Sequence, residues 1–196
     1  MDVTVQGFLT AVRVTLQSPR EAARALIAAD LPMPVLGLGL ALAAVASSLI
    51  THLGLLLAPL PDGAMQMIAP SPLRTAVLQG IVLLGLAAAV HQLGRLRGGR
   101  GIFSGALAVV VWVQAMLVVL QAVQLVAMVI LPPLAEILSV LGLGLFLSLL
   151  THFVAELHGF RSLGATFAGI VAAILVVAFV MSVVLTVLIG LPDQGV

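Results

Sequence analysis

Long apolar runs dominate the chain, and short segments containing Pro, Gly and Arg separate them. A helix needs about 20 apolar residues to cross the hydrocarbon core of a membrane. Five runs reach that length, and each predicts a transmembrane helix: about 35–58, 73–93, 104–131, 134–157 and 163–191. The pattern therefore predicts an all-α, polytopic membrane helix bundle with five transmembrane helices, occupying residues 32–196.

Residues 1–31 have a different, amphipathic pattern. In "SPRE", Ser18 can cap a helix that has Pro19 at its first position and Glu21 in its first turn. Apolar residues recur at helical spacing before and after this point. Two short interfacial helices on the membrane surface fit the pattern, and packing against the loops of the bundle fits it equally well. We expect a cytoplasmic amphipathic N-terminal segment.

Composition places the protein in a membrane. The chain is 62% hydrophobic and 8% charged, with a mean hydropathy of +1.31. About a quarter of the residues in a soluble domain are charged. The chain has no cysteine, which excludes disulfides and thiolate chemistry, and no lysine, which excludes Schiff-base chemistry. The N-terminus shows no basic start followed by a short apolar run, so we expect no cleaved signal peptide.

The distribution of arginines predicts the orientation, because basic residues concentrate in cytoplasmic segments. If the five runs alternate, only Arg74 lies on the outer side. The remaining arginines share the inner side: Arg13, Arg20, Arg24, Arg95, Arg97, Arg100 and Arg161. We therefore expect the N-terminus in the cytoplasm and the C-terminus outside, in a bacterial inner membrane. The net charge of +1 gives no reason to expect a nucleic-acid partner.

The stretch "LLTHFVAELHGF" carries the most chemistry. His152 and Glu156, four residues apart, share a helix face. One interpretation is a metal site formed with His91. The favoured interpretation is a cytoplasmic exit pair, in which Glu156 pairs with an arginine where the helix leaves the membrane. The similar His52 lies toward the opposite face, roughly 20 Å away in depth, and cannot share an ion with His152. We expect no catalytic residue, cofactor or metal.

Three glutamines in the third run, Gln114, Gln121 and Gln124, fall on one helical face. We interpret them as intramembrane polar packing through hydrogen bonds between helices, each bond contributing about 0.6 kcal/mol. The alternative is a hydrophilic pathway. No ionisable residue stands near the centre of any run, whereas a transporter is expected to carry charge or a broken helix there.

Three segments resemble the Yip-domain family of membrane proteins, specifically its bacterial members: "SPREAARALIAADLP", "RLRGGRGIFSGALAVVVWVQA" and "HGFRSLGATFAGI". The family architecture implies five spans with a cytoplasmic N-terminus. Eukaryotic relatives take part in vesicle trafficking with small GTPases of the Rab type, partly through longer N-terminal regions. Only about thirty residues precede the first span here, so we do not expect that role. The resemblance implies no catalytic residues.

These patterns together predict a non-enzymatic scaffold or accessory subunit. Its expected partners are anionic membrane lipids, other membrane proteins or a larger membrane complex, and a second copy of itself. The loop "GRLRGGRGIF" places Arg95, Arg97 and Arg100 near lipid head groups, as candidate lipid-binding or partner-binding residues. Alternatively, these arginines only fix the topology during insertion. The alternative function is a small transporter or channel that uses the glutamine face.

Overall fold

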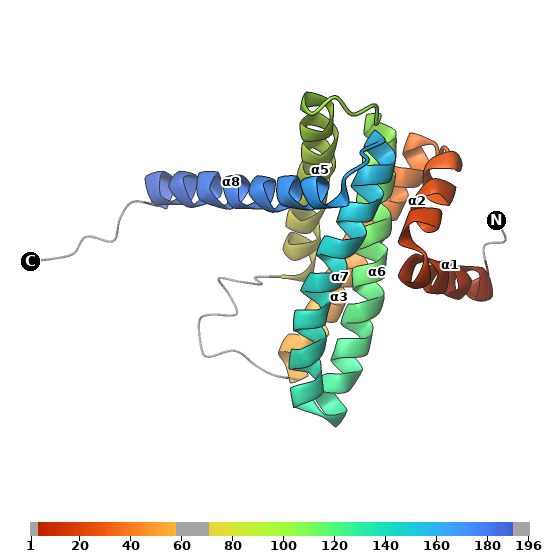
Figure 1. The fold of residues 1–196 in the computed structure, drawn as a ribbon. Helices are drawn as coiled ribbons and strands as arrows, with labels where there is room; N and C mark the ends of the chain where they lie inside the picture. Colours follow the sequence, from red (N-terminus) through yellow and green to blue (C-terminus); the bar gives the residue numbers. More distant parts are fainter. Residues whose placement is uncertain (1–3, 58–70, 190–196) are drawn as a thin grey trace, which may run out of the picture.

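The computed structural model describes residues 4–57 and 71–189, which form seven α-helices and no strand (Figure 1). In chain order the helices are α1 (Val5–Gln17), α2 (Pro19–Ala28), α3 (Met33–Leu57), α5 (Pro72–Leu96), α6 (Phe103–Ile130), α7 (Pro132–His158) and α8 (Leu163–Ile189). The predicted all-α fold is confirmed for these residues.

Four helices, α3, α5, α6 and α7, form the bundle and are long and apolar enough to cross a membrane. They correspond to the first four predicted runs. Proline or a left-handed residue fixes several boundaries: α2, α5 and α7 have proline in the first turn, and α7 ends at Gly159 with φ 72°. Proline suits the first turn because its missing N–H would be unpaired there, and glycine ends a helix because it tolerates positive φ.

The bundle alternates in direction. A Cβ added at Gly39 of α3 would lie 3.0 Å from Val111 of α6, and one at Gly54 would lie 3.7 Å from Leu125. The two helices are therefore parallel. The Ser48 hydroxyl donates to the carbonyl oxygen of Pro72 at 2.6 Å, and a Cβ added at Gly80 would lie 3.7 Å from Leu40, so α3 and α5 are antiparallel. Helix α6 contacts α3, α5 and α7 and forms the centre of the bundle.

Close contact between α6 and α7 forms much of the core. Phe153 of α7 and Val109 of α6 are completely buried, and Leu150 is nearly so. A Cβ at Gly142 would lie only 2.8 Å from Leu120, so the missing side chain brings the two backbones together. Between lipid-exposed helices, such close van der Waals packing replaces the hydrophobic effect as the main source of stability.

The fifth predicted span is not confirmed. Helix α8 forms over the expected residues, but it lies crosswise to the bundle (Figure 1). It contacts α7 near the linker at 159–162, and its apolar side chains further along are exposed, for example Leu175 and Phe179. The apolar run predicted a helix correctly. The angle between α7 and α8 is set by the linker, and the hydrophobicity of the run does not predict that angle.

The N-terminal segment packs on the bundle through both of its helices. Helix α2 contacts α7 and α6, and α1 contacts α2. The indole Nε1 of Trp112 on α6 donates to the hydroxyl of Thr15 at 3.0 Å, and Thr15 is fully buried. Phe8 packs edge-on against the same indole, with ring centroids 6.1 Å apart. These contacts of the segment are with helices of the bundle.

Candidate functional site: the arginine-rich end of the bundle

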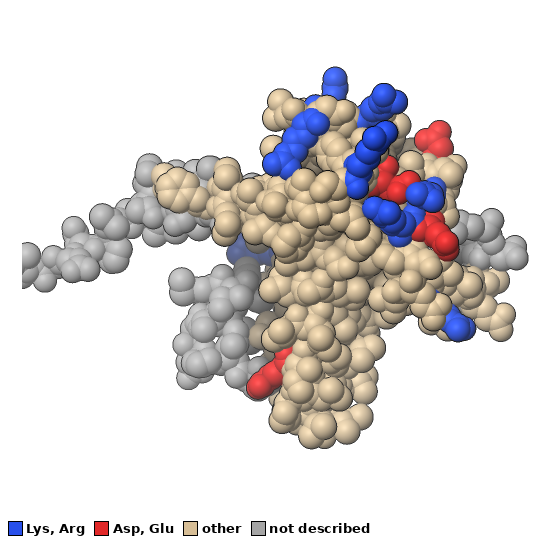
Figure 2. Space-filling view, in the orientation of Figure 1, with Lys and Arg blue, Asp and Glu red and all other residues tan. Residues whose placement is uncertain are grey.

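Basic side chains gather at one end of the bundle (Figure 2). Helix α5 ends there, α6 begins there and α7 ends there, and α2 packs alongside. We call this region the arginine-rich end and define it by Arg24, Arg95, Arg97, Arg100 and Arg161. At the opposite end, where α5 and α7 begin, the described residues carry Arg74 and Glu136.

A buried histidine connects three segments at the arginine-rich end. The backbone N–H of Gly101 donates to Nδ1 of His158 at 3.2 Å, and Nε2 lies 3.1 Å from the carbonyl oxygen of Val90. Since Nδ1 accepts, the proton is assigned to Nε2, which donates to Val90. The neutral imidazole thus joins the end of α7 to α5 and to the loop before α6. Its ring also stacks on Phe160, with centroids 5.4 Å apart.

Glycines make room for this imidazole. A Cβ at Gly94 or Gly99 would overlap the His158 ring, and one at Gly101 would lie 2.8 Å from it. Gly98, with φ +80°, turns the chain at the end of α5. The glycine-rich loop therefore serves close packing around His158 as well as the turn between two helices.

Glu156 pairs with an arginine of the N-terminal segment. Its Oε1 accepts from Nε of Arg24 at 2.7 Å, which joins α7 to α2. The hydrogen bond and the charge of Glu156 raise the pKa of Arg24. His152 has a different partner, because its Nδ1 lies 2.7 Å from the carbonyl oxygen of Ser148 on its own helix. The two residues predicted as an exit pair thus make separate contacts.

The three candidate lipid-binding arginines have three different environments. Nη1 of Arg97 donates to the carbonyl oxygen of Ala165 on α8 at 3.2 Å. A Cβ at Gly169 would overlap the same guanidinium, so α8 is shaped to accept it. Arg95, in the last turn of α5, is exposed. Arg100 lines a cavity between α2, α6 and α7. Arg97 therefore holds a helix, whereas Arg95 and Arg100 are open to other contacts.

The cavity beside Arg100 has a volume of about 230 Å³. Asp30 and Ser104 also line it. Its remaining lining is apolar side chains and backbone: Leu26, Ile27, Leu31, Gly101, Ile102, Gly105, Ala108 and Leu157. Charged groups of both signs, a hydroxyl and apolar walls thus meet in one small space.

The candidate metal site is not assembled. Among the residues that the structure describes, no three His, Cys, Asp or Glu side chains come close enough to hold an ion. His91 instead packs edge-on against Phe103 of α6, with ring centroids 6.0 Å apart. Position along a helix predicts depth in the membrane but does not specify which helix faces meet.

The glutamines of α6 lie in unequal surroundings. Gln114 is buried, whereas Gln121 and Gln124 are half-buried. Gln124 lies near Gly142 of α7, and Oε1 of Gln121 is buried without a hydrogen-bond partner among the described residues. The hydrogen bond between helices involves a different glutamine: Nε2 of Gln79 on α5 donates to the hydroxyl of Ser47 on α3 at 3.0 Å.

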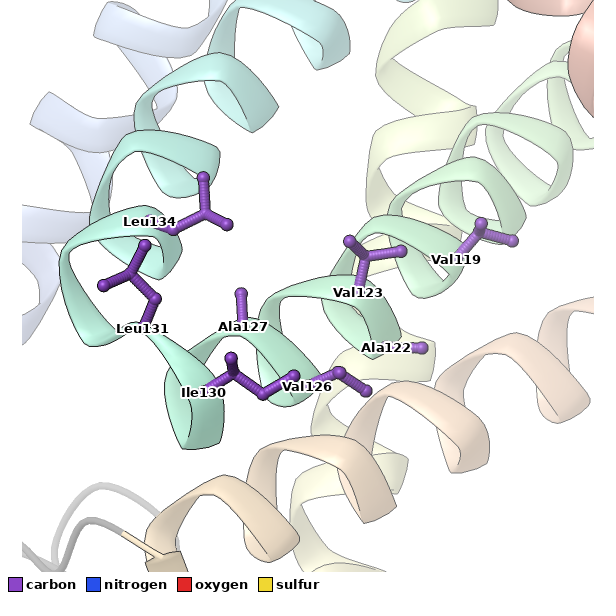
Figure 3. A pocket seen from close by; sticks show the side chains of 8 residues that line it. All are labelled: Val119, Ala122, Val123, Val126, Ala127, Ile130, Leu131 and Leu134. Carbon is purple, nitrogen blue, oxygen red and sulfur yellow. The ribbon is translucent and has the colours of Figure 1, made fainter.

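A second cavity, of about 630 Å³, lies beside the far half of α6 (Figure 3). Its lining is entirely apolar: Val119, Ala122, Val123, Val126, Ala127, Ile130, Leu131 and Leu134. Neither Gln121 nor Gln124 contributes to that lining. The glutamine face and this cavity therefore do not form a common polar pathway.

Sequence reasoning missed the contacts made by single polar residues in apolar surroundings: His158, Gln79, and the Thr15–Trp112 pair. A signal existed for His158, because three glycines before α6 can leave space for one ring. No pattern in the sequence indicated that Thr15 meets Trp112, since 97 residues separate them.

Comparison with known proteins gives one match. A family model described as the Yip1 domain matches residues 14–185, which include the end of α1, all of α2 to α7 and most of α8. No curated protein and no solved structure matches the chain.

Proposed function

The chain belongs to the Yip1 domain family, and we propose that this multi-pass membrane protein is a non-enzymatic scaffold or accessory subunit that binds lipids and other membrane proteins. One observation carries the proposal. The side chains at the arginine-rich end that resemble acid–base groups hold helices together: Glu156 binds Arg24, and His158 binds Val90 and Gly101. Glu156 and His158 therefore have a structural role.

We place the protein in a bacterial inner membrane with the arginine-rich end in the cytoplasm. The support is the charge asymmetry between the two ends, because basic residues are retained on the cytoplasmic side. Anionic lipids also concentrate at that surface, and each basic residue there contributes about 1 kcal/mol of attraction. Arg95 and Arg100 are available for that contact.

We also propose that α8 crosses the membrane as a fifth span, which puts the C-terminus outside. Residues 163–189 contain no charged residue. A helix that lies in the membrane surface needs a charged or polar face, and α8 has none. In the structure α8 lies crosswise to the bundle and contacts Arg97, so the crossing requires a rotation at the linker 159–162 that breaks the contacts of Arg97 with α8.

The partner-binding element in this proposal is α8. Side chains along it are exposed on the isolated protein, including Phe167, Leu175 and Phe179. Such a surface is covered either by lipid tails or by another transmembrane helix. We propose that a transmembrane helix of a different membrane protein covers this surface, since a scaffold needs a stable protein partner. A second copy of this chain is the competing outcome.

The test is purification of tagged full-length protein in mild detergent, followed by mass spectrometry of the retained proteins and lipids. The proposal predicts at least one membrane protein in stoichiometric amount. A control preparation with α8 removed after Ser162 keeps the four helices of the bundle and should lose that partner. Retention of the same proteins without α8 contradicts the proposed surface.

A transporter or channel is the second candidate, favoured by one observation: Oε1 of Gln121 is buried in a span without a partner among the described residues. Buried polar groups of this kind commonly bind water or solute. Solute flux into liposomes that is abolished by Gln121→Leu and kept in Val123→Leu would support this candidate over a scaffold. Unchanged flux in Gln121→Leu would eliminate it.

A further inference from the structure

The cavity at the end of α2 contains two charged side chains of opposite sign without charged partners. Arg100 comes from the loop before α6, and Asp30 follows the end of α2. Within residues 4–57 and 71–189 the structure has one ion pair, Arg24–Glu156, so neither Arg100 nor Asp30 is neutralised there. A ligand that carries both charges would complement both side chains.

Ser104 adds a hydroxyl to the same cavity. It lies in the first turn of α6, and its side chain makes no hydrogen bond with the described part of the chain. A guanidinium and a hydroxyl together offer several donors to an oxyanion. Guanidinium groups match phosphate oxygens especially well, because their N–H donors form a planar fork.

Apolar walls complete the cavity. Leu26 and Ile27 come from α2, Ala108 from α6 and Leu157 from α7, and Ile102 beside them is 61% exposed. A small water-soluble phosphate would leave these walls unused. An amphiphile would bury its first methylene groups against them, at about 25 cal/mol per Å² of apolar surface removed from water.

We propose that this cavity binds the head group of an aminophospholipid of the phosphatidylethanolamine type. The phosphodiester lies at Arg100 and Ser104, the primary ammonium lies at Asp30, and the glycerol region lies against Leu26 and Ile27. The assignment deepens the proposed lipid binding and rests on the arginine-rich end facing the inner leaflet. It also names a different lipid class from the anionic lipids attracted by exposed arginines.

The two charges define the selectivity. Phosphatidylglycerol offers a phosphodiester but no cation for Asp30. Phosphatidylcholine offers a cation without N–H donors and with three methyl groups, which enlarge it. A cavity of about 230 Å³ that is lined by both a carboxylate and a guanidinium therefore favours the ethanolamine head group over both.

The test uses the full chain in detergent with equal amounts of the three phospholipids and matched acyl chains. Native mass spectrometry then measures the lipid retained per protein. Arg100→Gln removes the phosphate contact, and Asp30→Asn removes the ammonium contact. Asn also suits the backbone of Asp30, which has φ 40°, because Asn tolerates the left-handed region. Arg95→Gln is the matched control, since Arg95 lies at the same end and does not line the cavity.

Wild type and Arg95→Gln should retain the ethanolamine lipid in preference to the glycerol and choline lipids. Arg100→Gln should retain about tenfold less, as expected for loss of a charged hydrogen bond. Asp30→Asn should keep phospholipid binding but lose the preference for ethanolamine over choline. Emission of the single tryptophan, Trp112, checks the fold of each variant. If Arg100→Gln misfolds, Ser104→Ala replaces it, with a smaller expected loss of retained lipid.

Equal losses in Arg95→Gln and Arg100→Gln would overturn the site, because they would indicate general surface attraction. An unchanged preference in Asp30→Asn would also overturn it, as would displacement of the lipid by millimolar free phosphoethanolamine. Co-purifying proteins are measured in the same samples. If those proteins remain while lipid selectivity is absent, the cavity assignment fails and the scaffold proposal stands.

Discussion

Nε2 of His158 lies 3.1 Å from the carbonyl oxygen of Val90, so the last residue of α7 is bound to α5 across 68 residues of chain. The same imidazole accepts from Gly101 in the loop before α6. One side chain thus fixes how three helices meet at the arginine-rich end. The positions of Arg97 and Arg100 depend on it, because both lie in the loop that His158 holds.

The first prediction concerns the space around this ring. Gly94→Ala should lower the free energy of unfolding by about 1–3 kcal/mol, because the added Cβ would overlap the imidazole of His158. The control is Gly85→Ala on the same helix, where nothing lies within 4 Å of the added Cβ. Unfolding in detergent is followed by Trp112 emission. Equal stability of the two variants would contradict the role of His158.

The second prediction concerns the attachment of α8. Arg97→Gln removes the hydrogen bond to Ala165, and Gly169→Ala fills the place of the guanidinium. Both should broaden the distance distribution between spin labels on cysteines introduced at Leu96 and Val176, two exposed positions in a chain without native cysteine.

Gly164→Ala is the control for that experiment, because nothing lies within 4 Å of its added Cβ. It should leave the distance distribution unchanged. If Arg97→Gln also leaves the distance distribution unchanged, Arg97 does not hold α8. Arg97 is then available for contact with lipid, as Arg95 is.

The third prediction concerns the docking of α1. Thr15→Val removes the acceptor of the Trp112 indole and should cost about 1–3 kcal/mol, the usual range for a buried polar group left without a partner. Trp112 emission should shift, and trypsin should cut faster after Arg13. Thr10→Val is the control, since Thr10 bonds only within its own helix. The same behaviour in both variants would show that α1 is not held through Trp112.

Sequence periodicity predicted the helices well because apolar length and helix breakers act locally. Pro72, Pro132 and Gly159 end or begin helices at or beside the expected residues. Which faces of two helices pack together depends on the whole bundle and not on the local sequence. A metal site of His91, His152 and Glu156 was one interpretation of the sequence, but the contacting faces of α5 and α7 bring His158 to Val90 instead. The partner of Glu156 was expected to be an arginine, yet no local pattern selected Arg24.

The candidate lipid-binding arginines show the same limit. Their spacing predicted one basic surface, and the three residues do lie at one end of the bundle, where α5 ends and α6 begins. The sequence could not indicate that Gly169 leaves space for Arg97, or that Asp30, 70 positions before Arg100, lines the same cavity. Both the space for Arg97 and the shared cavity of Asp30 and Arg100 arise from tertiary packing.

The fourth prediction concerns topology. A reporter active only in the cytoplasm should be active when inserted at Gly98 and silent after Val196, because in the proposed topology α8 carries the chain across the membrane. Activity at both positions would mean that α8 stays on the inner side and that the protein has four spans. Silence at Gly98 with activity after Val196 would reverse the proposed orientation.

The scaffold proposal is tested most directly by photocrosslinking from α8 in intact membranes. A benzophenone amino acid replaces Phe179, which is 70% exposed on α8, or Val82, which is 66% exposed on α5 and serves as the control. The proposal predicts a discrete adduct with a different membrane protein from position 179 and only lipid adducts from position 82. Lipid adducts alone at both positions, or an adduct with a second copy of this chain, would contradict it.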